Sequence, residues 1–140
     1  MAEEMRSPIE SGCPDAFQYM HPVMRKNFGQ WAYHEDLRPG VLVHVSHNGD
    51  KIYTVRAGTQ RILDLFTLRK LCDIGDEYGE GYIHFTIRSN IEYQLADEAK
   101  VEPLIKKLED EGFIVGGTRN SVTMISHTQG WLHCDIPGTD

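Results

Sequence analysis

The chain has few cysteines and no long apolar segment. Its three cysteines, Cys13, Cys72 and Cys134, are too scattered for a disulfide framework, so a reducing cytoplasm is the expected location. No apolar run approaches the length that crosses a bilayer, and the acidic first residues lack the apolar stretch of a secretory signal. At 140 residues we expect one soluble domain with its own core and no membrane association.

Basic charge is also scarce. The chain carries 21 acidic residues against 14 lysines and arginines, a net charge of −7, which argues against non-specific nucleic-acid binding. Acids gather in the expected helices, whereas arginines lie on or beside the expected strands. The strand arginines are Arg56, Arg61, Arg88 and Arg119. Because charged helices are ordinarily just solvated, only these arginines predict a local anion site.

Most sequence motifs of catalysis and cofactor binding are absent. There is no Walker A or Rossmann glycine pattern, no Cys-x-x-Cys pair, no histidine pair at zinc spacing and no Gly-x-Ser-x-Gly elbow. His127, His133 and Cys134 lie close in sequence and could ligate a metal. The alternative, structural histidines held by hydrogen bonds, is the commoner outcome, so we predict no metal site.

Residues 82–95 predict two strands joined by a tight connection near Ser89 and Asn90. Apolar and polar side chains alternate through the segment, so its two faces should differ. The apolar row consists of Ile83, Phe85, Ile87, Ile91, Tyr93 and Leu95. The polar face is either a wetted surface, which is the usual outcome, or the floor of an anion site with Arg88 as its charge.

The N-terminal 40 residues predict an extended arm. Its first half is rich in Ser, Pro, Gly and acids and shows no period. Its second half adds Phe28, Trp31 and Tyr33, which we expect to hold the arm against a partner or against another part of the same protein. Residues 41–45 and 51–57 then predict a hairpin around Asn48-Gly49, a strong turn signal.

Two amphipathic helices and a last strand complete the pattern. The first helix should be capped by Thr67, carry Cys72 in the core and end at Gly79 or Gly81. The second spans about 97–111, with Asp97 as its cap and Pro103 either kinking it or lying near its start. Residues 122–129 predict the final strand.

The order of elements from residue 51 is strand, helix, strand, strand, helix, strand. It predicts an α+β, ferredoxin-like split βαβ fold, with an antiparallel sheet and both helices on one face. An extra strand and the arm (1–40) precede it, so the domain spans 41–140. With Tyr53 and Val55 in the core, the open face would carry polar side chains. They are Arg56, His84, Thr86, Arg88, Asn90, Glu92 and Gln94.

Several blocks of rare residues resemble the beta subunit of dissimilatory sulfite reductase. Those at the start are His21-Pro22-Val23, Trp31-x-Tyr33-His34-Glu35 and Gly49-Asp50-Lys51-Ile52-Tyr53-Thr54-Val55-Arg56. Later blocks are Thr86-x-Arg88-x-Asn90-x-Glu92 and His127-Thr128-Gln129-Gly130-Trp131-Leu132-His133-Cys134. The resemblance covers nearly everything from His21 to Asp140.

The resemblance implies a function and its residues. The family reduces sulfite toward sulfide, or runs in reverse in sulfur oxidisers, with sirohaem coupled to a 4Fe-4S cluster. By position, Arg56 resembles the arginine that faces the bound anion, and Arg88 the arginine that holds the cofactor. Supporting polar contacts would come from Thr86, Asn90, His127, Thr128 and Gln129. Arginine suits this work because it offers fixed, bidentate donors and stays charged.

Two expectations follow from where the chain departs from the family. The three cysteines lack the spacing that binds a cluster, and family members continue beyond this length. We therefore expect an N-terminal portion of a beta subunit that works with an alpha subunit and is inactive alone. The alternative is a stand-alone ferredoxin-like anion-binding or regulatory module without a redox centre.

Overall fold

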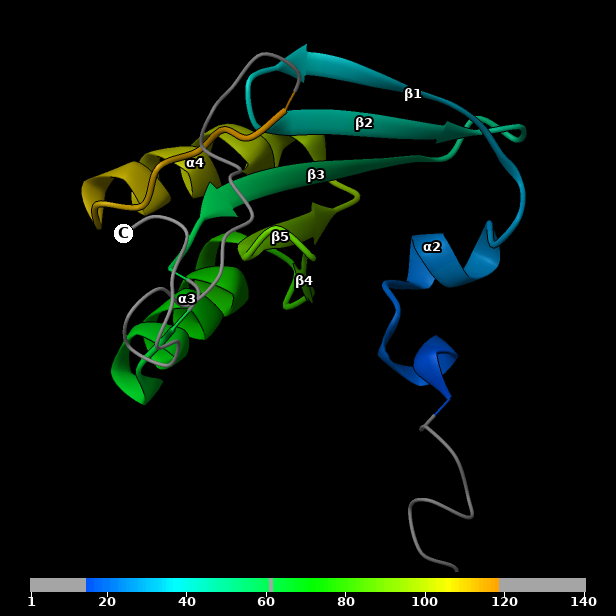
Figure 1. Ribbon diagram of the computed structural model, residues 1–140. Helices are drawn as coiled ribbons and strands as arrows, with labels where there is room; N and C mark the ends of the chain where they lie inside the picture. Colours follow the sequence, from blue (N-terminus) through cyan, green and yellow to red (C-terminus); the bar gives the residue numbers. More distant parts are fainter. Residues whose placement is uncertain (1–14, 61, 119–140) are drawn as a thin grey trace, which may run out of the picture.

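The computed structural model describes residues 15–60 and 62–118, which form one antiparallel sheet with helices (Figure 1). The five strands lie in the order β1-β2-β3-β5-β4. They are β1 (Trp31–Arg38), β2 (Val41–Ser46), β3 (Lys51–Gly58), β4 (Ile83–Phe85) and β5 (Asn90–Leu95). The helices are η1 (Ala16–Tyr19), α2 (Pro22–Lys26), α3 (Leu65–Tyr78), η2 (Glu98–Lys100) and α4 (Val101–Asp110). The α+β ferredoxin-like arrangement is confirmed, whereas the expected strand 122–129 lies outside the described residues.

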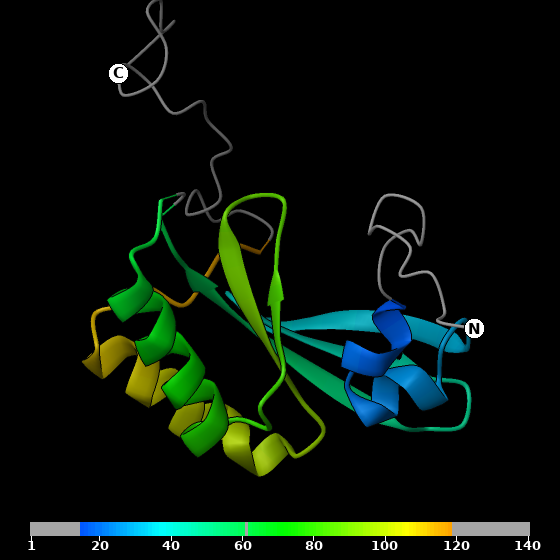
Figure 2. The same ribbon diagram turned by 90° about the horizontal axis from the view of Figure 1, so that it is seen from below.

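The core lies between one face of the sheet and helices α3 and α4. Alternate residues of β2, β3 and β5 point into it, as the sequence predicted for Tyr53, Val55 and the row beginning at Ile91. They meet Leu71 and Ile74 of α3 and four apolar residues of α4. Seen from below, the two helices lie together on one side, while η1 and α2 lie at the other end of the strands (Figure 2). The opposite sheet face is therefore left for other contacts.

Local signals explain where most elements begin and end. Gly49 turns the β2–β3 hairpin with a φ of 89°, and Gly79 ends α3 as expected. The expected cap of α3 was wrong by three residues, because Asp64 is the cap and accepts a hydrogen bond from the Thr67 amide at 2.8 Å. Pro103 is the third residue of α4, where the missing N–H would have no acceptor within the helix, so α4 is regular from Val101.

The 82–95 hairpin is shorter than its alternation suggested. Strand β4 ends at Phe85, because the Thr86 amide donates to the Asn90 carbonyl at 2.8 Å and Ser89 adopts a φ of 61° to close the turn. Phe85 is 58% exposed and Ile87 94% exposed, so the apolar row predicted for 82–95 is not buried at these two positions. Cys72 is also exposed rather than buried on α3.

The sequence analysis missed a strand inside the arm. Trp31–Arg38 forms β1 and pairs with β2 along its length, with irregular register near each end. Its alternation is hidden because most of its side chains are polar or exposed on this edge strand. Phe28 and Tyr33, two of the aromatic residues expected to hold the arm, are each 58% exposed. They are not buried against the described part of this chain, and their contact with a partner stays a prediction.

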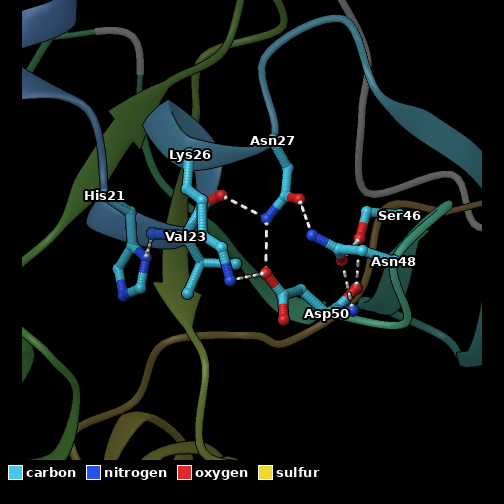
Figure 3. Close-up of polar contacts among 7 residues, drawn as sticks. All are labelled: His21, Val23, Lys26, Asn27, Ser46, Asn48 and Asp50. Atoms are coloured by element: carbon cyan, nitrogen blue, oxygen red, sulfur yellow. Dashed lines mark hydrogen bonds and ion pairs between the residues drawn. The ribbon is translucent and has the colours of Figure 1, made fainter.

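Besides β1, polar side chains attach the arm to the sheet (Figure 3). Asn27, 1% exposed, donates through Nδ2 to the Val23 carbonyl and to Asp50 Oδ2, both at 2.9 Å. Its Oδ1 accepts from Asn48 Nδ2 at 2.9 Å. Lys26 adds an ion pair to Asp50. The β2–β3 turn is thus the docking point of α2.

A second attachment joins the arm to the far end of α3. His21 Nε2 lies 2.7 Å from Glu80 Oε2, and Glu80 Oε1 accepts from the Asp97 amide at 3.0 Å. Burial opposes the charge of Glu80, but the bonds from His21 and from the backbone outweigh it and lower its pKa. An ionised Glu80 therefore links the arm, the end of α3 and the start of η2.

Candidate functional site

The open face of the sheet carries a connected set of polar side chains around Arg56. The antiparallel register places Arg56 of β3 opposite Glu92 of β5, and Glu92 opposite His84 of β4. Side chains that face one another across such a pair lie close on the same face. This confirms the expected common face of Arg56, His84 and Glu92.

Arg56 is held on two sides. Its Nε donates to Glu92 Oε1 at 2.5 Å, and its Nη2 forms an ion pair with the same oxygen. Its Nη1 donates to the Gly117 carbonyl at 2.8 Å. Glu92 Oε2 lies 3.2 Å from His84 Nδ1. Arg56 therefore faces the open side with a fixed orientation and a charge partly balanced by Glu92.

The neighbouring strands extend this face with two histidines that the sequence analysis did not single out. His34 of β1 lies opposite His44 of β2, with ring centroids 5.7 Å apart. Burial, followed by the charge of His34, lowers the pKa of His44; Glu92 raises it and Arg56 lowers it. We expect a neutral His44 near pH 7. Only the register between β1 and β2 brings these two histidines together, and the sequence did not predict β1 as a strand.

Arg88 lies in the turn after β4 rather than on a strand. It is exposed, and within the described part of the chain its guanidinium has no hydrogen bond or ion pair. Thr86 and Asn90 build this turn, since Thr86 Oγ1 accepts from the Asn90 amide at 3.1 Å and Asn90 Nδ2 donates to the Arg88 carbonyl at 2.8 Å. Thr59 Oγ1 also donates to the Ser89 carbonyl at 2.7 Å. The turn is thus fixed by local bonds while the arginine head stays in solvent.

The structure tests the predicted residues unevenly. Arg56 is on the open face, whereas Arg88 projects from the hairpin tip. Thr86 and Asn90 shape the tip, and their direct contact with a ligand stays a prediction. His127, Thr128 and Gln129 lie outside the described residues.

Other classes of site are not seen in the described chain. Within residues 15–60 and 62–118, no three His, Cys, Asp or Glu side chains cluster so as to hold a metal ion. None of the helices described there is long and apolar enough to pass through a bilayer.

Comparison with known proteins now adds the family. Residues 44–111 match the model of the nitrite/sulfite reductase ferredoxin-like half domain. The chain is 45% identical over 136 residues to the "Sulfite reductase, dissimilatory-type subunit beta" of Archaeoglobus fulgidus, covering 92% of this chain and 37% of that protein. The subunit of the same name from Nitratidesulfovibrio vulgaris is 48% identical, covering 88% and 34%.

A third relative extends the match to almost the whole chain. The same-named subunit of Megalodesulfovibrio gigas is 40% identical over 147 residues, covering 99% of this chain and 56% of that protein. The chain thus spans between about a third and just over half of the length of these relatives. The chain is a homologue of the beta subunits of dissimilatory-type sulfite reductases and contains their ferredoxin-like half domain.

Proposed function

We propose that this chain forms part of a dissimilatory-type sulfite reductase and contributes to the cavity that holds sirohaem and sulfite. The observation that carries the proposal is the 40–48% identity to three beta subunits over 88–99% of the chain. Physical support comes from Arg56, because a positive, directional donor on an open sheet face suits an oxyanion or a carboxylate.

The described residues fit one of the two expected cofactors. Sirohaem carries peripheral carboxylates, and Arg88 has an exposed guanidinium at the hairpin tip that could hold one. Among the described residues, donors on both terminal nitrogens of Arg56 have no partner and could serve a sulfite oxygen. When bound, sirohaem would supply the iron centre for electron transfer to sulfur. The described part of the chain has no set of ligands for a 4Fe-4S cluster, and we derive no role for it in binding one.

Within the site, the chain's own residues would bind and orient the anion. Arg56 would donate two hydrogen bonds that strengthen as negative charge builds on the sulfite oxygens. We place Arg56 as the catalytic residue and Arg88, Thr86 and Asn90 at the cofactor. A beta subunit also implies an alpha subunit as partner, and we propose the cytoplasm as the compartment.

The test is an absorption titration of the 140-residue chain with sirohaem. We expect saturable binding that weakens at least about tenfold in Arg88→Ala and in Arg56→Ala, since each removes a charge-assisted contact. Arg38→Ala is the matched control, because Arg38 pairs with Glu102 of α4 instead of serving the open face. Thermal melting of each variant separates lost binding from lost folding.

Two results would count against the proposal. If the absorption of the wild-type chain shows no saturable change with sirohaem, the chain does not bind sirohaem by itself. Arginine variants that melt earlier but bind as well as wild type would show that the two guanidinium groups serve the fold. Either result would favour the alternative, a binding or regulatory module without a redox centre.

A further inference from the structure

Glu92 is the least solvent-accessible acid of the open face, with 8% of its surface exposed. It lies on β5, which is flanked by β3 on one side and by the edge strand β4 on the other. Burying a carboxylate is costly unless its oxygens are paired. Both oxygens are in fact occupied, one by Arg56 and the other by His84. Packing of the hydrophobic core therefore does not explain why a carboxylate is buried at this position.

The contacts of Arg56 show what Glu92 does to the guanidinium. A guanidinium has five N–H donors. Glu92 accepts from Nε and pairs with Nη2, and the Gly117 carbonyl accepts one hydrogen bond from Nη1. At least one N–H on each terminal nitrogen then has no partner among the described residues. Those two donors are what a bidentate anion would use.

Glu92 is itself anchored, so it can act as a fixed support. Its backbone is paired on both sides, to Arg56 of β3 and to His84 of β4. The His84 imidazole, more than half exposed, limits rotation of the carboxylate from the other side. Rotation of the Arg56 side chain would require breaking contacts at both Glu92 and Gly117.

We propose that Glu92 is a positioning residue, which holds the Arg56 guanidinium so that its two remaining donors point at the bound anion. The inference rests on the proposed function and adds how that site is preorganised. It competes with a simpler view, in which Glu92 only neutralises Arg56. The two views predict opposite signs. Loss of a positioning carboxylate weakens anion binding, whereas loss of a neutralising one strengthens it by leaving Arg56 with its full charge.

The first experiment is a double-mutant cycle between Glu92 and Arg56, read by sirohaem titration of the full chain. Glu92→Ala should weaken binding by about tenfold, and adding it to Arg56→Ala should cause no further loss, because it acts through Arg56. Glu102→Ala is the matched control, since it breaks the Arg38 pair between β1 and α4. Glu92→Gln keeps the acceptor oxygen and should stay within about threefold of wild type.

The second readout follows the guanidinium directly. In ¹⁵N-labelled protein, the Arg56 Nε–H should give a separate, slowly exchanging resonance in wild type and in Glu92→Gln. It should exchange rapidly in Glu92→Ala. If Glu92→Ala does not fold, Glu92→Gln alone decides, because the neutralising view requires it to bind more tightly than wild type.

The outcomes separate the two levels of inference. If Arg56→Ala binds sirohaem like wild type, the proposed function fails and the positioning role fails with it. If Arg56→Ala weakens binding but Glu92→Ala does not, or if their losses add, the site stands and the positioning role is overturned. A gain of more than about threefold in either Glu92 variant also overturns it.

Discussion

Gly40, which connects β1 to β2, should tolerate no side chain. Its φ is 83°, and a Cβ built there would lie 2.5 Å from the Gly116 nitrogen and 2.8 Å from the Gly116 Cα. Its amide also donates to Thr118 Oγ1 at 3.0 Å, and its carbonyl accepts from the Arg56 amide at 2.8 Å. The third atom that a methyl group would meet is Val115 Cγ1, at 2.8 Å. The two Gly116 atoms belong to the backbone, so they can yield only if this segment of the chain moves.

The cost of Gly40→Ala has two parts. The left-handed conformation costs alanine about 1–2 kcal/mol, and overpacking against fixed atoms typically costs about 1–3 kcal/mol more. We therefore expect the free energy of unfolding to fall by about 2–5 kcal/mol. Gly49→Ala is the matched control, because Gly49 has a φ of 89° and nothing within 4 Å of the added atom. The free energy of unfolding of Gly49→Ala should fall only by the cost of the left-handed conformation.

Equilibrium unfolding in urea measures both variants on one scale, with the midpoint reporting stability and the slope reporting the surface exposed. Gly40→Ala should unfold at clearly lower urea than Gly49→Ala, with a similar slope. It should also disturb the Arg56 Nε–H resonance, because Gly116 donates to the Arg56 carbonyl and Gly117 accepts from its side chain. Equal losses in the two variants would refute the argument from close approach.

Three further predictions concern single groups. Asp64→Ala removes the cap that accepts from Thr67, so unfolding should be easier by about 1 kcal/mol in urea. Tyr93→Phe removes the buried hydroxyl that donates to the Leu71 carbonyl at 2.9 Å, at a cost of about 0.5–1.5 kcal/mol by the same assay. His44 should titrate below its ordinary pKa of 6.5 in an NMR series, since burial and His34 oppose its charge.

The sign of the His44 effect on stability follows from linkage. Its folded pKa is lowered, so the unfolded chain binds more protons in the range between the two pKa values. Its contribution to stability is therefore complete above about pH 6.5 and is lost as the pH falls toward the folded pKa. A His44→Gln variant should lose that part of the pH dependence. A wild-type His44 that titrates at or above 6.5 would contradict the burial argument.

Sequence periodicity predicted the parts of the fold whose two faces differ in chemistry. The alternation in 51–57 and 91–95 found the inner rows of β3 and β5, and Asn48-Gly49 located the hairpin turn. Periodicity failed to predict a strand whose two faces are both largely exposed to solvent. Strand β1 lies at an edge and its exposed side chains give no apolar row, so only its hydrogen-bonded pairing with β2 reveals it as a strand.

The candidate site was predicted to the level of residue types but not of contacts. Alternation placed Arg56, Glu92 and His84 on one face because a strand register preserves parity. It misplaced Arg88, since extending β4 through Ile87 ignored the turn that Thr86 and Asn90 build. Sequence could not show that Arg56 is held by Glu92 and Gly117. Glu92 becomes its neighbour only when β3 and β5 pair, and Gly117 only when the segment after α4 runs beside β3.

That pairing also sets the order in which the protein can fold as it is synthesised. The β2–β3 hairpin forms from adjacent residues, but β3 meets β5 only after α3 and β4 have been made. Until α4, which follows β5, has also been made, it cannot cover the inward side chains of β2, including Val41 and Val43. The growing chain thus carries an exposed apolar hairpin for the time needed to make about half of the domain, a state prone to self-association. Slowing synthesis after β3 should therefore lower the yield of folded protein more than slowing it after α4.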